Sequence, residues 1–412
     1  MTEAATASAN PTLPAGASAV QHLDDYAPVL GEGEIAELRA LAAPLAGRSV
    51  KMVNSTAMGG GVAELLNRMV PLMDELGLKV RWDVLTGGND FFEVTKAFHN
   101  ALHGRPYEPG PRDFEIFLAV NEQNRARLHL DSEFMVIHDP QPAALINARK
   151  NHSGHWVWRC HIDLSHANPT VWDFLEPFVL GYDAAIFSSP EFTRQLKIPQ
   201  YLFYPAIDPL SAKNHALEPE YVQGVLKQFQ IDPERPILTQ ISRFDRLKDP
   251  VGVVKAYHIV KQYYDCQLVL AGGGASDDPE GGAVLAEVRQ AAAGDPDIHI
   301  LDLPPWSALE INALQRASTI VIQKSLREGF GLTVTEALWK KKPVVASAVG
   351  GIPSQVIHKH TGMLAHSIEG TAYQIRFLLS HPALAKKLGE QGHEHVRENF
   401  LITSNVRRYL TM

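Results

Sequence analysis

Two cations on one loop in the second half of the chain could hold a phosphorylated ligand. Arg243 and Lys248 lie in the segment SRFDRLKD, directly before a predicted helix that begins at Pro250. An arginine fork and a lysine point charge beside a helix N-terminus suit a diphosphate. A solvated surface loop is the alternative reading of this segment taken alone.

A glycine-rich loop further along the chain carries two carboxylates. Glu328 and Glu336 lie in KSLREGFGLTVTEA, where glycines on both sides of Phe330 free backbone amides at a predicted helix start. Thr333 and Glu336 match the spacing of a capping box, which would give Glu336 a structural role. The pattern offers Glu328 no such role, and a carboxylate on this loop could accept hydrogen bonds from hydroxyl groups.

The first half of the chain has loops of the same kind. Glycines occupy positions 59–61, between an apolar run that ends at Asn54 and a predicted helix. They permit close approach of a ligand to backbone N–H groups, although a plain tight turn is equally compatible. His138 with Asp139, and His161, each stand at the end of a predicted strand. All of these side chains would therefore lie on the rim where ligands bind.

Metal and disulfide chemistry find little support. Cys160 and Cys266 are far apart in apolar segments, so we expect buried, unpaired thiols in a reducing compartment. The histidines at 358–360 and 393–395 lie in polar segments typical of an exposed surface, and the aspartates at 295–297 fit a turn. We expect no metal and no cofactor.

The elements that must position these loops are short strands alternating with helices. Apolar runs of strand length occur at 50–54, 80–85, 134–138, 157–162 and 184–189, and again at 236–242, 266–274, 298–303, 319–325 and 343–351. This alternation predicts parallel sheets in two doubly wound α/β halves. Ligands of such sheets bind beyond the carboxyl ends of the strands, where the candidate loops fall.

The halves define expected domains. We expect a disordered tail at 1–20, a first Rossmann-like domain at 21–215 and a second at 216–394. A terminal helix at about 395–412 is expected to cross back to the first domain.

Composition limits the possible partners. The 412 residues are 45% hydrophobic and 20% charged, enough for a large core, and the formal net charge of -8 provides no basic field for nucleic acid. The first twenty residues lack the basic start and apolar core of a signal peptide, and no apolar run could span a bilayer. We therefore expect a cytoplasmic protein without nucleic-acid or membrane partners.

With these loops in place, the chain resembles the family 4 retaining glycosyltransferases of the GT-B fold, in which two Rossmann-like domains face each other across a cleft. The resemblance rests on EGFGLTVTEA with its two glutamates, on SRFDRLKD, on AVGGIP at 348–353 and on the strand-ending His161. The segments NSTAMGGGVAELLNRMVPLM, FFEVTKAFHNALHG, VIHDPQPAAL and WRCHIDLS are similar to the trehalose-forming members of that family.

The resemblance implies an activity. It is the transfer of glucose from ADP-glucose or UDP-glucose to free glucose, giving α,α-trehalose in a reversible, metal-independent reaction. A homodimer is the assembly we expect. The sequence does not indicate the preferred base or the direction of flux.

The resemblance also implies roles for individual residues. On the donor side, Arg243 and Lys248 would hold the diphosphate and stabilise the leaving group, Glu328 would bind donor-glucose hydroxyls, Glu336 would bind the ribose, and the amides of Gly331, Leu332 and Thr333 would meet the phosphate and sugar. Near the reacting sugar and the acceptor it implies His161, Asp139, Asn54, Gly60 and Gly61, with Glu64 a weaker candidate.

Three other functions remain compatible with the sequence. A trehalose phosphorylase would use similar loops with phosphate as co-substrate. A related glucosyltransferase could use another acceptor, although no basic cluster near residues 54–64 would hold a sugar phosphate. A non-catalytic sugar-binding protein could keep the fold, but the intact Arg243, Lys248, Glu328 and Glu336 argue against lost activity.

Overall fold

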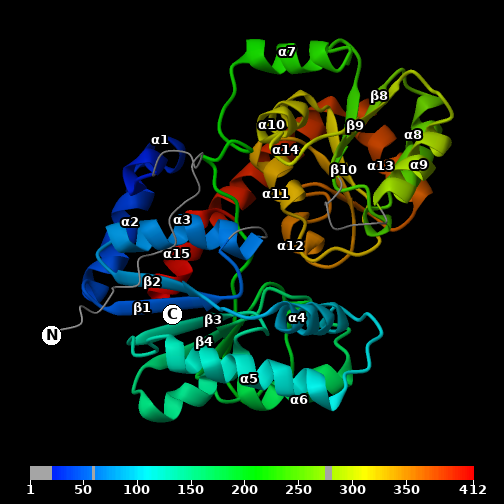
Figure 1. The fold of residues 1–412 in the computed structure, drawn as a ribbon. Coiled ribbons are helices and arrows are strands. Elements are labelled where there is room, and N and C mark those ends of the chain that lie inside the picture. Colours follow the sequence, from blue (N-terminus) through cyan, green and yellow to red (C-terminus); the bar gives the residue numbers. More distant parts are fainter. Residues whose placement is uncertain (1–20, 58–60, 274–280) are drawn as a thin grey trace. The chain divides into compact units, whose positions relative to one another are not determined.

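The computed structural model describes residues 21–57, 61–273 and 281–412 of the chain, so the expected tail at 1–20 lies outside it (Figure 1). The chain divides into two compact units. The first runs up to Tyr204 and includes Ile402–Met412, and the second spans Pro205–Leu401. The first unit is therefore discontinuous in sequence.

The division differs from the expected ranges because the segment before residue 216 is bonded to the second unit. The Asn312 side-chain amide donates to the carbonyls of Ala212, at 3.0 Å, and His215, at 2.9 Å. The Arg316 guanidinium donates to the carbonyls of Asn214, at 3.0 Å, and His215, at 2.8 Å. Both donors lie on one helix of the second unit, so they hold 205–215 there.

The first unit is built on a six-stranded parallel sheet. Its strands are β1 (Ser49–Asn54), β2 (Lys79–Val84), β3 (Phe134–His138), β4 (His155–Arg159), β5 (Ala184–Phe187) and β6 (Gln200–Leu202). Their order is β2-β1-β3-β4-β5-β6, and all neighbouring pairs are parallel. From β1 the chain passes to β2 on one side of it and then crosses back to β3 on the other side. The topological switch point therefore lies between β1 and β3.

Helices cover both faces of this sheet (Figure 1). One layer holds α2 (Glu32–Ala42), α3 (Gly61–Glu75) and α15 (Ile402–Thr411), preceded by η1 (Leu23–Tyr26) and α1 (Ala27–Leu30) and followed after α2 by η2 (Ala43–Leu45). The other holds α4 (Asn89–Leu102), α5 (Pro111–Arg127), α6 (Pro169–Val179) and η3 (Ala143–Asn151), and η4 (Pro190–Phe192) follows β5. Buried aromatic side chains from these helices and from β4 share one core between the second layer and the sheet, among them Phe91, Phe98, Phe117, Trp156 and Trp158.

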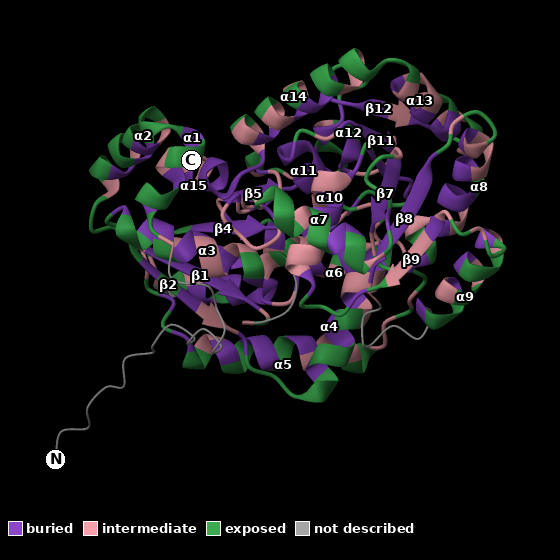
Figure 2. Ribbon diagram, turned by 90° about the horizontal axis from the view of Figure 1, so that it is seen from above, coloured by how far each residue is buried: buried purple, intermediate pink, exposed green. Residues whose placement is uncertain are grey.

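The second unit repeats the plan with another strand order. Its strands are β7 (Ile237–Ile241), β8 (Gln267–Gly272), β9 (Ile298–Asp302), β10 (Ile320–Gln323), β11 (Val344–Ser347) and β12 (Met363–Ala365). The order β12-β11-β10-β7-β8-β9 is that of a doubly wound dinucleotide-binding sheet, with its switch point between β7 and β10. Strands of both sheets are mostly buried, in keeping with their continuous apolar sequences (Figure 2).

Helices precede, connect and follow the strands of the second unit. They are α7 (Pro219–Gln228), η5 (Arg246–Lys248), α8 (Pro250–Lys261), α9 (Gly281–Ala292), α10 (Ala308–Ala317), α11 (Leu332–Trp339), α12 (Ile352–Gln355), α13 (Ile368–Ser380) and α14 (Pro382–Asn399). One core packs α8, α9 and α13 on the sheet, and another packs α7 and α10. Within the described ranges, no helix combines the length and apolar character that crossing a bilayer requires.

Candidate functional site

The switch point of the second sheet joins the cationic loop to the glycine-rich loop through an ion pair. Lys248, just after β7, places its Nζ 2.7 Å from both carboxylate oxygens of Glu328, in the loop after β10. Ser325 Oγ at 3.0 Å and Gln323 Nε2 at 3.3 Å also donate to Glu328 Oε2. The side chain of Glu328 is only 8% exposed and that of Lys248 18%. Glu328 therefore has structural partners of its own, although none of these contacts caps a helix.

Gln240, a buried residue of β7, holds these two loops together. Its Nε2 donates to the Lys248 carbonyl at 3.0 Å, and its Oε1 accepts from the Lys324 N–H at 2.9 Å. The Leu326 N–H donates to the Leu247 carbonyl at 2.7 Å. The geometry of the Lys248–Glu328 pair is thus fixed by the sheet and by loop-to-loop hydrogen bonds, which is the support that a precise site requires.

The other predicted cation has a different environment. Arg243 is 55% exposed and pairs with Asp245 at 3.0 Å, while Asp245 also caps η5 by accepting from the Leu247 N–H at 2.6 Å. Solvent weakens a pair this exposed. The Arg243 fork therefore remains accessible to a phosphate at the carboxyl end of β7.

Helix α11 begins two residues earlier than a capping box of Thr333 and Glu336 would need. Gly331, at φ 83°, is its N-cap residue, and no side chain caps the first turn. Thr333 lies inside the helix, and its hydroxyl donates to Gln323 Oε1 at 3.1 Å. The capping-box interpretation of Thr333 and Glu336 was wrong, because Gly331 supplies the left-handed conformation that starts the helix two residues sooner. The backbone N–H groups of the first turn, including those of Leu332 and Thr333, can donate hydrogen bonds to an anion.

Glu336 lies in a buried polar cluster rather than at a helix start. Glu336 is only 6% exposed, and its Oε2 lies 3.5 Å from Gln315 Nε2. One turn on, Lys340 donates to the Glu336 carbonyl at 3.2 Å and to Asn214 Oδ1 at 3.1 Å. Burial lowers the pKa of Lys340 to about 7, and the negative charge of Glu336 opposes that change. A carboxylate this well packed is a rigid acceptor for a hydroxyl.

The AVGGIP loop packs directly on the glycine-rich loop. The Gly351 N–H donates to the Gly329 carbonyl at 2.8 Å. A Cβ added at Gly350, whose φ is 53°, would lie 1.7 Å from the Glu328 carbonyl oxygen. Only glycine permits this approach, so 348–353 supports the backbone that carries Glu328.

In the first unit, the loops after β3 and β4 converge through Asp139. This residue has a positive φ of 69°, and its Oδ1 accepts from the His161 N–H at 2.8 Å. The Asp139 N–H donates to the Arg159 carbonyl at 2.8 Å, and the Trp158 Nε1–H donates to the Asp139 carbonyl at 3.0 Å. Asp139 thus shapes the loop that presents His161.

A histidine pair also joins these loops. His138 Nδ1 lies 3.0 Å from His161 Nε2, and the two rings stack at 15° with centroids 5.3 Å apart. Sequence analysis named both residues but missed their contact. The signal available in the sequence was that the two histidines stand at the ends of consecutive predicted strands. In the structure these strands are neighbours, and His138 is in register with Arg159, two residues before His161.

Burial and a buried cation set the charges of this cluster. Burial lowers the pKa of His138 to about 3 and that of His161 well below its ordinary value, and the Arg159 charge adds to both effects. Burial raises the pKa of Asp139 to about 7, against the hydrogen bond from His161 and the Arg159 charge. Arg159, 1% exposed, donates to the carbonyl of Phe203 at 2.5 Å. Both imidazoles are therefore neutral.

The raised pKa of Asp139 predicts a pH-dependent stability. The folded protein retains this proton at pH values where the unfolded chain has lost it, so the contribution is complete below about pH 4 and is lost as pH rises through about 7. Compared with Asp139→Asn, the native protein should therefore lose free energy of unfolding between these limits. Urea unfolding of both proteins from pH 4 to 8 measures the difference, and a constant difference would contradict this account.

The remaining predicted residues of the first unit have various environments. Asn54 is 2% exposed, donates to the Thr56 carbonyl at 2.7 Å and accepts from Trp82 Nε1 at 2.9 Å, so its amide supports the loop after β1. Gly61 is the first residue of α3, and Glu64 is exposed in its first turn. Gly60 lies outside the described residues.

Both cysteines are buried and unpaired, as predicted. In the part of the chain that the structure describes, no three His, Cys, Asp or Glu side chains are grouped to hold a metal ion.

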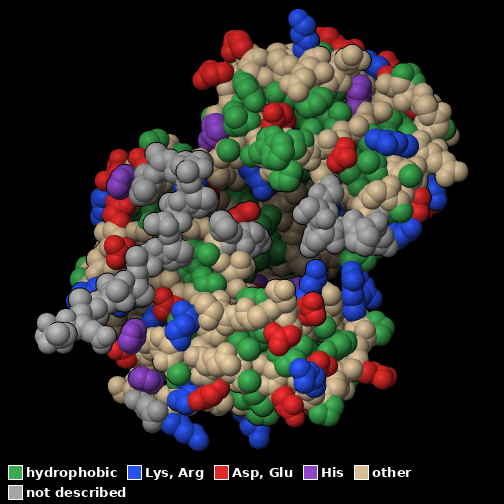
Figure 3. Space-filling model, viewed as in Figure 1, with side chains coloured by type: hydrophobic (Ala, Val, Ile, Leu, Met, Phe, Trp, Pro, Cys, Tyr) green, Lys and Arg blue, Asp and Glu red, His purple; other side chains and the backbone are tan. Residues whose placement is uncertain are grey.

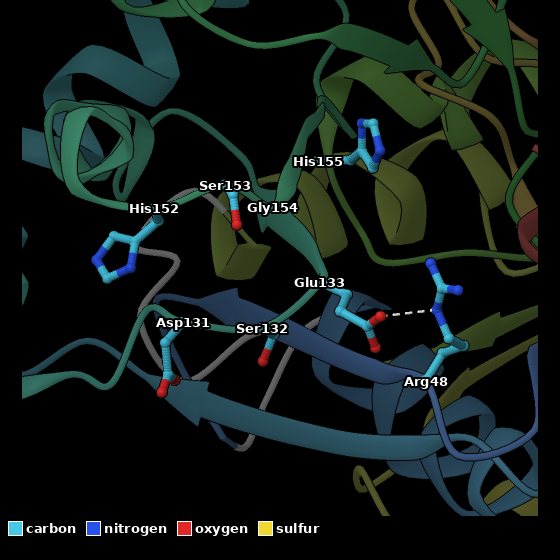
Figure 4. Close-up of a pocket in the computed structure, with 8 residues that line it drawn as sticks. All are labelled: Arg48, Asp131, Ser132, Glu133, His152, Ser153, Gly154 and His155. Atoms are coloured by element: carbon cyan, nitrogen blue, oxygen red, sulfur yellow. Dashed lines mark ion pairs between the residues drawn. The ribbon is translucent and has the colours of Figure 1, made fainter.

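A pocket in the first unit lies away from these loops (Figure 4). It is lined by Arg48, Asp131, Ser132, Glu133, His152, Ser153, Gly154 and His155. Arg48 and Glu133 form an ion pair there at 2.8 Å. These residues precede or begin β1, β3 and β4, the opposite end of the sheet from His138 and His161. Ligands of open α/β sheets bind at the other end, so we assign this pocket no role.

The two doubly wound units and their loops define a glycosyltransferase of the GT-B class. Two family models match the chain, "Trehalose synthase, N-terminal domain" over residues 52–194 and "Glycosyl transferases group 1" over residues 225–395. The chain belongs to the trehalose synthase family of group 1 glycosyltransferases, and it is a hexosyltransferase of trehalose metabolism.

Individual relatives support this placement. The trehalose synthase of Pyrococcus horikoshii is 43% identical over 399 residues, which cover 95% of this chain and 96% of the relative. That of Rubrobacter xylanophilus is 44% identical over 388 residues, covering 92% and 93%. A solved trehalose-6-phosphate synthase superposes with a TM-score of 0.70 at 14% identity, covering 89% of this chain and 98% of the other. The GT-B prediction is confirmed.

Proposed function

We propose that the protein transfers glucose from ADP-glucose or UDP-glucose to the anomeric hydroxyl of free glucose, forming α,α-trehalose reversibly and with retention of configuration. The observation that carries this proposal is the Lys248–Glu328 pair at the switch point of the second sheet. It lies in the same loop system as Arg243 and the uncapped first turn of α11. A diphosphate and a hexose are the ligand that this set of groups fits.

The groups suggest how the bond to the nucleotide is broken. As the bond from glucose C1 to the phosphate oxygen cleaves, Arg243, Lys248 and the α11 amides would stabilise the charge on the departing diphosphate. The acceptor oxygen then bonds to C1 on the same face, and its proton passes to the leaving phosphate. Because these cations come from the protein, we expect turnover to persist in the presence of EDTA.

Roles in the first unit complete the proposal. We assign His161 to the reacting sugar and Asp139 to the acceptor. Asp139 Oδ1 already accepts the His161 N–H, which argues against Asp139 as a nucleophile. A trapped glucosyl ester on Asp139 or Glu328 would overturn same-face attack.

The net charge supports the absence of nucleic acid among the partners. Basic and acidic side chains are interspersed over each unit on the face shown in Figure 3, and the formal net charge is -8. The homodimer stays a prediction, which sedimentation velocity would test.

The decisive assay offers ADP-glucose, UDP-glucose and GDP-glucose separately with free glucose and identifies the disaccharide by NMR. We expect α,α-trehalose with at least one of the first two donors. Trehalose incubated with phosphate, and separately with ADP or UDP, tests the phosphorylase alternative. Release of glucose 1-phosphate only in the phosphate mixture would replace our proposal with that one.

A further inference from the structure

His138 is a buried titratable side chain to which the proposed reaction gives no role. It ends β3 and is 0% exposed. Its Nδ1 faces His161 Nε2 at 3.0 Å, while its Nε2 is buried without a hydrogen-bond partner in the described part of the chain. The planes of the two rings are nearly parallel, at 15° to each other.

This contact contains a single proton. When both imidazoles are neutral, one of the facing nitrogens must donate and the other must accept. If His161 donated, His138 would carry its own proton on Nε2, as a buried N–H with nothing to accept it. If His138 donates from Nδ1, its Nε2 is a bare lone pair. Unpaired buried N–H groups are the rarer and more costly case, so the proton belongs on His138 Nδ1.

The position of this proton decides what His161 can offer a ligand. Since His161 Nε2 accepts from His138, the proton of His161 must be on Nδ1. We propose that His138 is a positioning residue that fixes His161 as the Nδ1–H tautomer, so that His161 meets the reacting sugar as a neutral hydrogen-bond donor. The inference rests on the proposed role of His161 at that sugar.

The surrounding charges favour a donor without positive charge. The Arg159 charge acts on both rings and disfavours an imidazolium on either of them. The Asp139 carboxyl lies beside the pair, where it accepts the backbone N–H of His161. Cleavage of a glycosidic C1–O bond places positive charge on the sugar ring. A neutral N–H can orient a sugar oxygen without opposing that charge, whereas a cationic imidazolium would oppose it.

The test compares two replacements of His138. His138→Leu fills the space but removes the bridge. In His138→Asn the amide nitrogen takes the place of Nδ1 and can still donate to His161 Nε2. His155→Leu is the matched control, since His155 lies at the other end of the same pair of strands and stacks on Phe134.

Two measurements are made on each variant. Proton–nitrogen NMR of ¹⁵N-histidine protein should show His161 protonated on Nδ1 in the native protein and in His138→Asn, but not uniformly in His138→Leu. Turnover should fall by about 10- to 100-fold in kcat for His138→Leu, with KM for the donor little changed. His138→Asn and His155→Leu should stay within about threefold of the native rate by the same reasoning. Thermal melts establish that each variant is folded.

Three results would overturn the proposal. They are a native His161 protonated on Nε2, an unchanged tautomer in folded His138→Leu, and a folded His138→Asn as slow as His138→Leu. The NMR measurement needs no turnover. If no glucosyl transfer is found but the His161 tautomer changes in His138→Leu, the proposed function is wrong. The inference that His138 fixes the His161 tautomer is then still supported.

Discussion

Replacing Lys248 by methionine is expected to lower kcat for glucosyl transfer about 100- to 1,000-fold, the usual cost of losing one preorganised group that stabilises a leaving charge. Methionine keeps most of the side-chain length but cannot donate. The change also leaves the carboxylate of Glu328, 8% exposed, without its counter-ion, so the melting temperature should fall. Initial rates at saturating donor, with urea unfolding of the same preparation, separate the two effects.

Arg246→Met is the matched control. Arg246 belongs to the same turn η5, is 52% exposed and pairs with Glu287 at 2.7 Å, an exposed pair of small energetic value. Removing this cation should leave kcat and stability nearly unchanged. Equal losses in the two variants would mean that general positive charge on the turn, rather than the Lys248 contact, supports the reaction.

Glu328→Gln is expected to lower kcat about 100-fold, because an amide oxygen is a weaker acceptor for the sugar hydroxyls than a carboxylate. The nucleotide affinity should change little, because the protein groups that bind the diphosphate are still present. Glu328→Ala should lose activity and also stability, since it deprives Lys248 of both carboxylate contacts at 2.7 Å. Isothermal calorimetry with ADP or UDP, beside initial rates, gives the two quantities.

The Lys248→Met and Glu328→Gln double variant tests whether the two side chains act together. Residues joined by a close ion pair give non-additive changes, so the double variant should be more stable than the sum of the single losses predicts. Glu287→Gln is the control for a lost carboxylate on the surface. Normal turnover by Glu328→Ala would require the donor site to be sought elsewhere.

The strands and the two doubly wound halves could be predicted because local patterns carry that information. FMVIH at 134–138 and AAIF at 184–187 are continuous apolar runs, and both are buried strands. The largely apolar run at 50–54, followed by glycines and a helical pattern, has few alternative structures. The resemblance then supplied the fold name, which the family models and solved structures confirm.

Contacts between distant residues could not be predicted in the same way. Lys248 and Glu328 are 80 positions apart, and they meet only because β7 and β10 are neighbours in the sheet order. The pairing of His138 with His161 likewise depends on β3 lying beside β4. The capping box failed for a related reason. Its spacing fits Thr333 and Glu336, but the conformation of Gly331 decides where α11 starts.

Because helix α15 belongs to the first unit but comes last in the chain, the first unit cannot finish folding until synthesis is complete. It packs against α2 and α3, and Arg407 bonds to Glu34 and, at 3.1 Å, to Glu37, yet it follows the entire second unit in the chain. At about 5–20 residues per second, a ribosome needs roughly 10–40 s to make the intervening segment. During that time the first unit lacks the helix whose Tyr409 ring packs on Phe203 beside Arg159. The nascent first unit thus exposes an apolar face that a chaperone could bind, and it reaches its native state only after the second unit has been made.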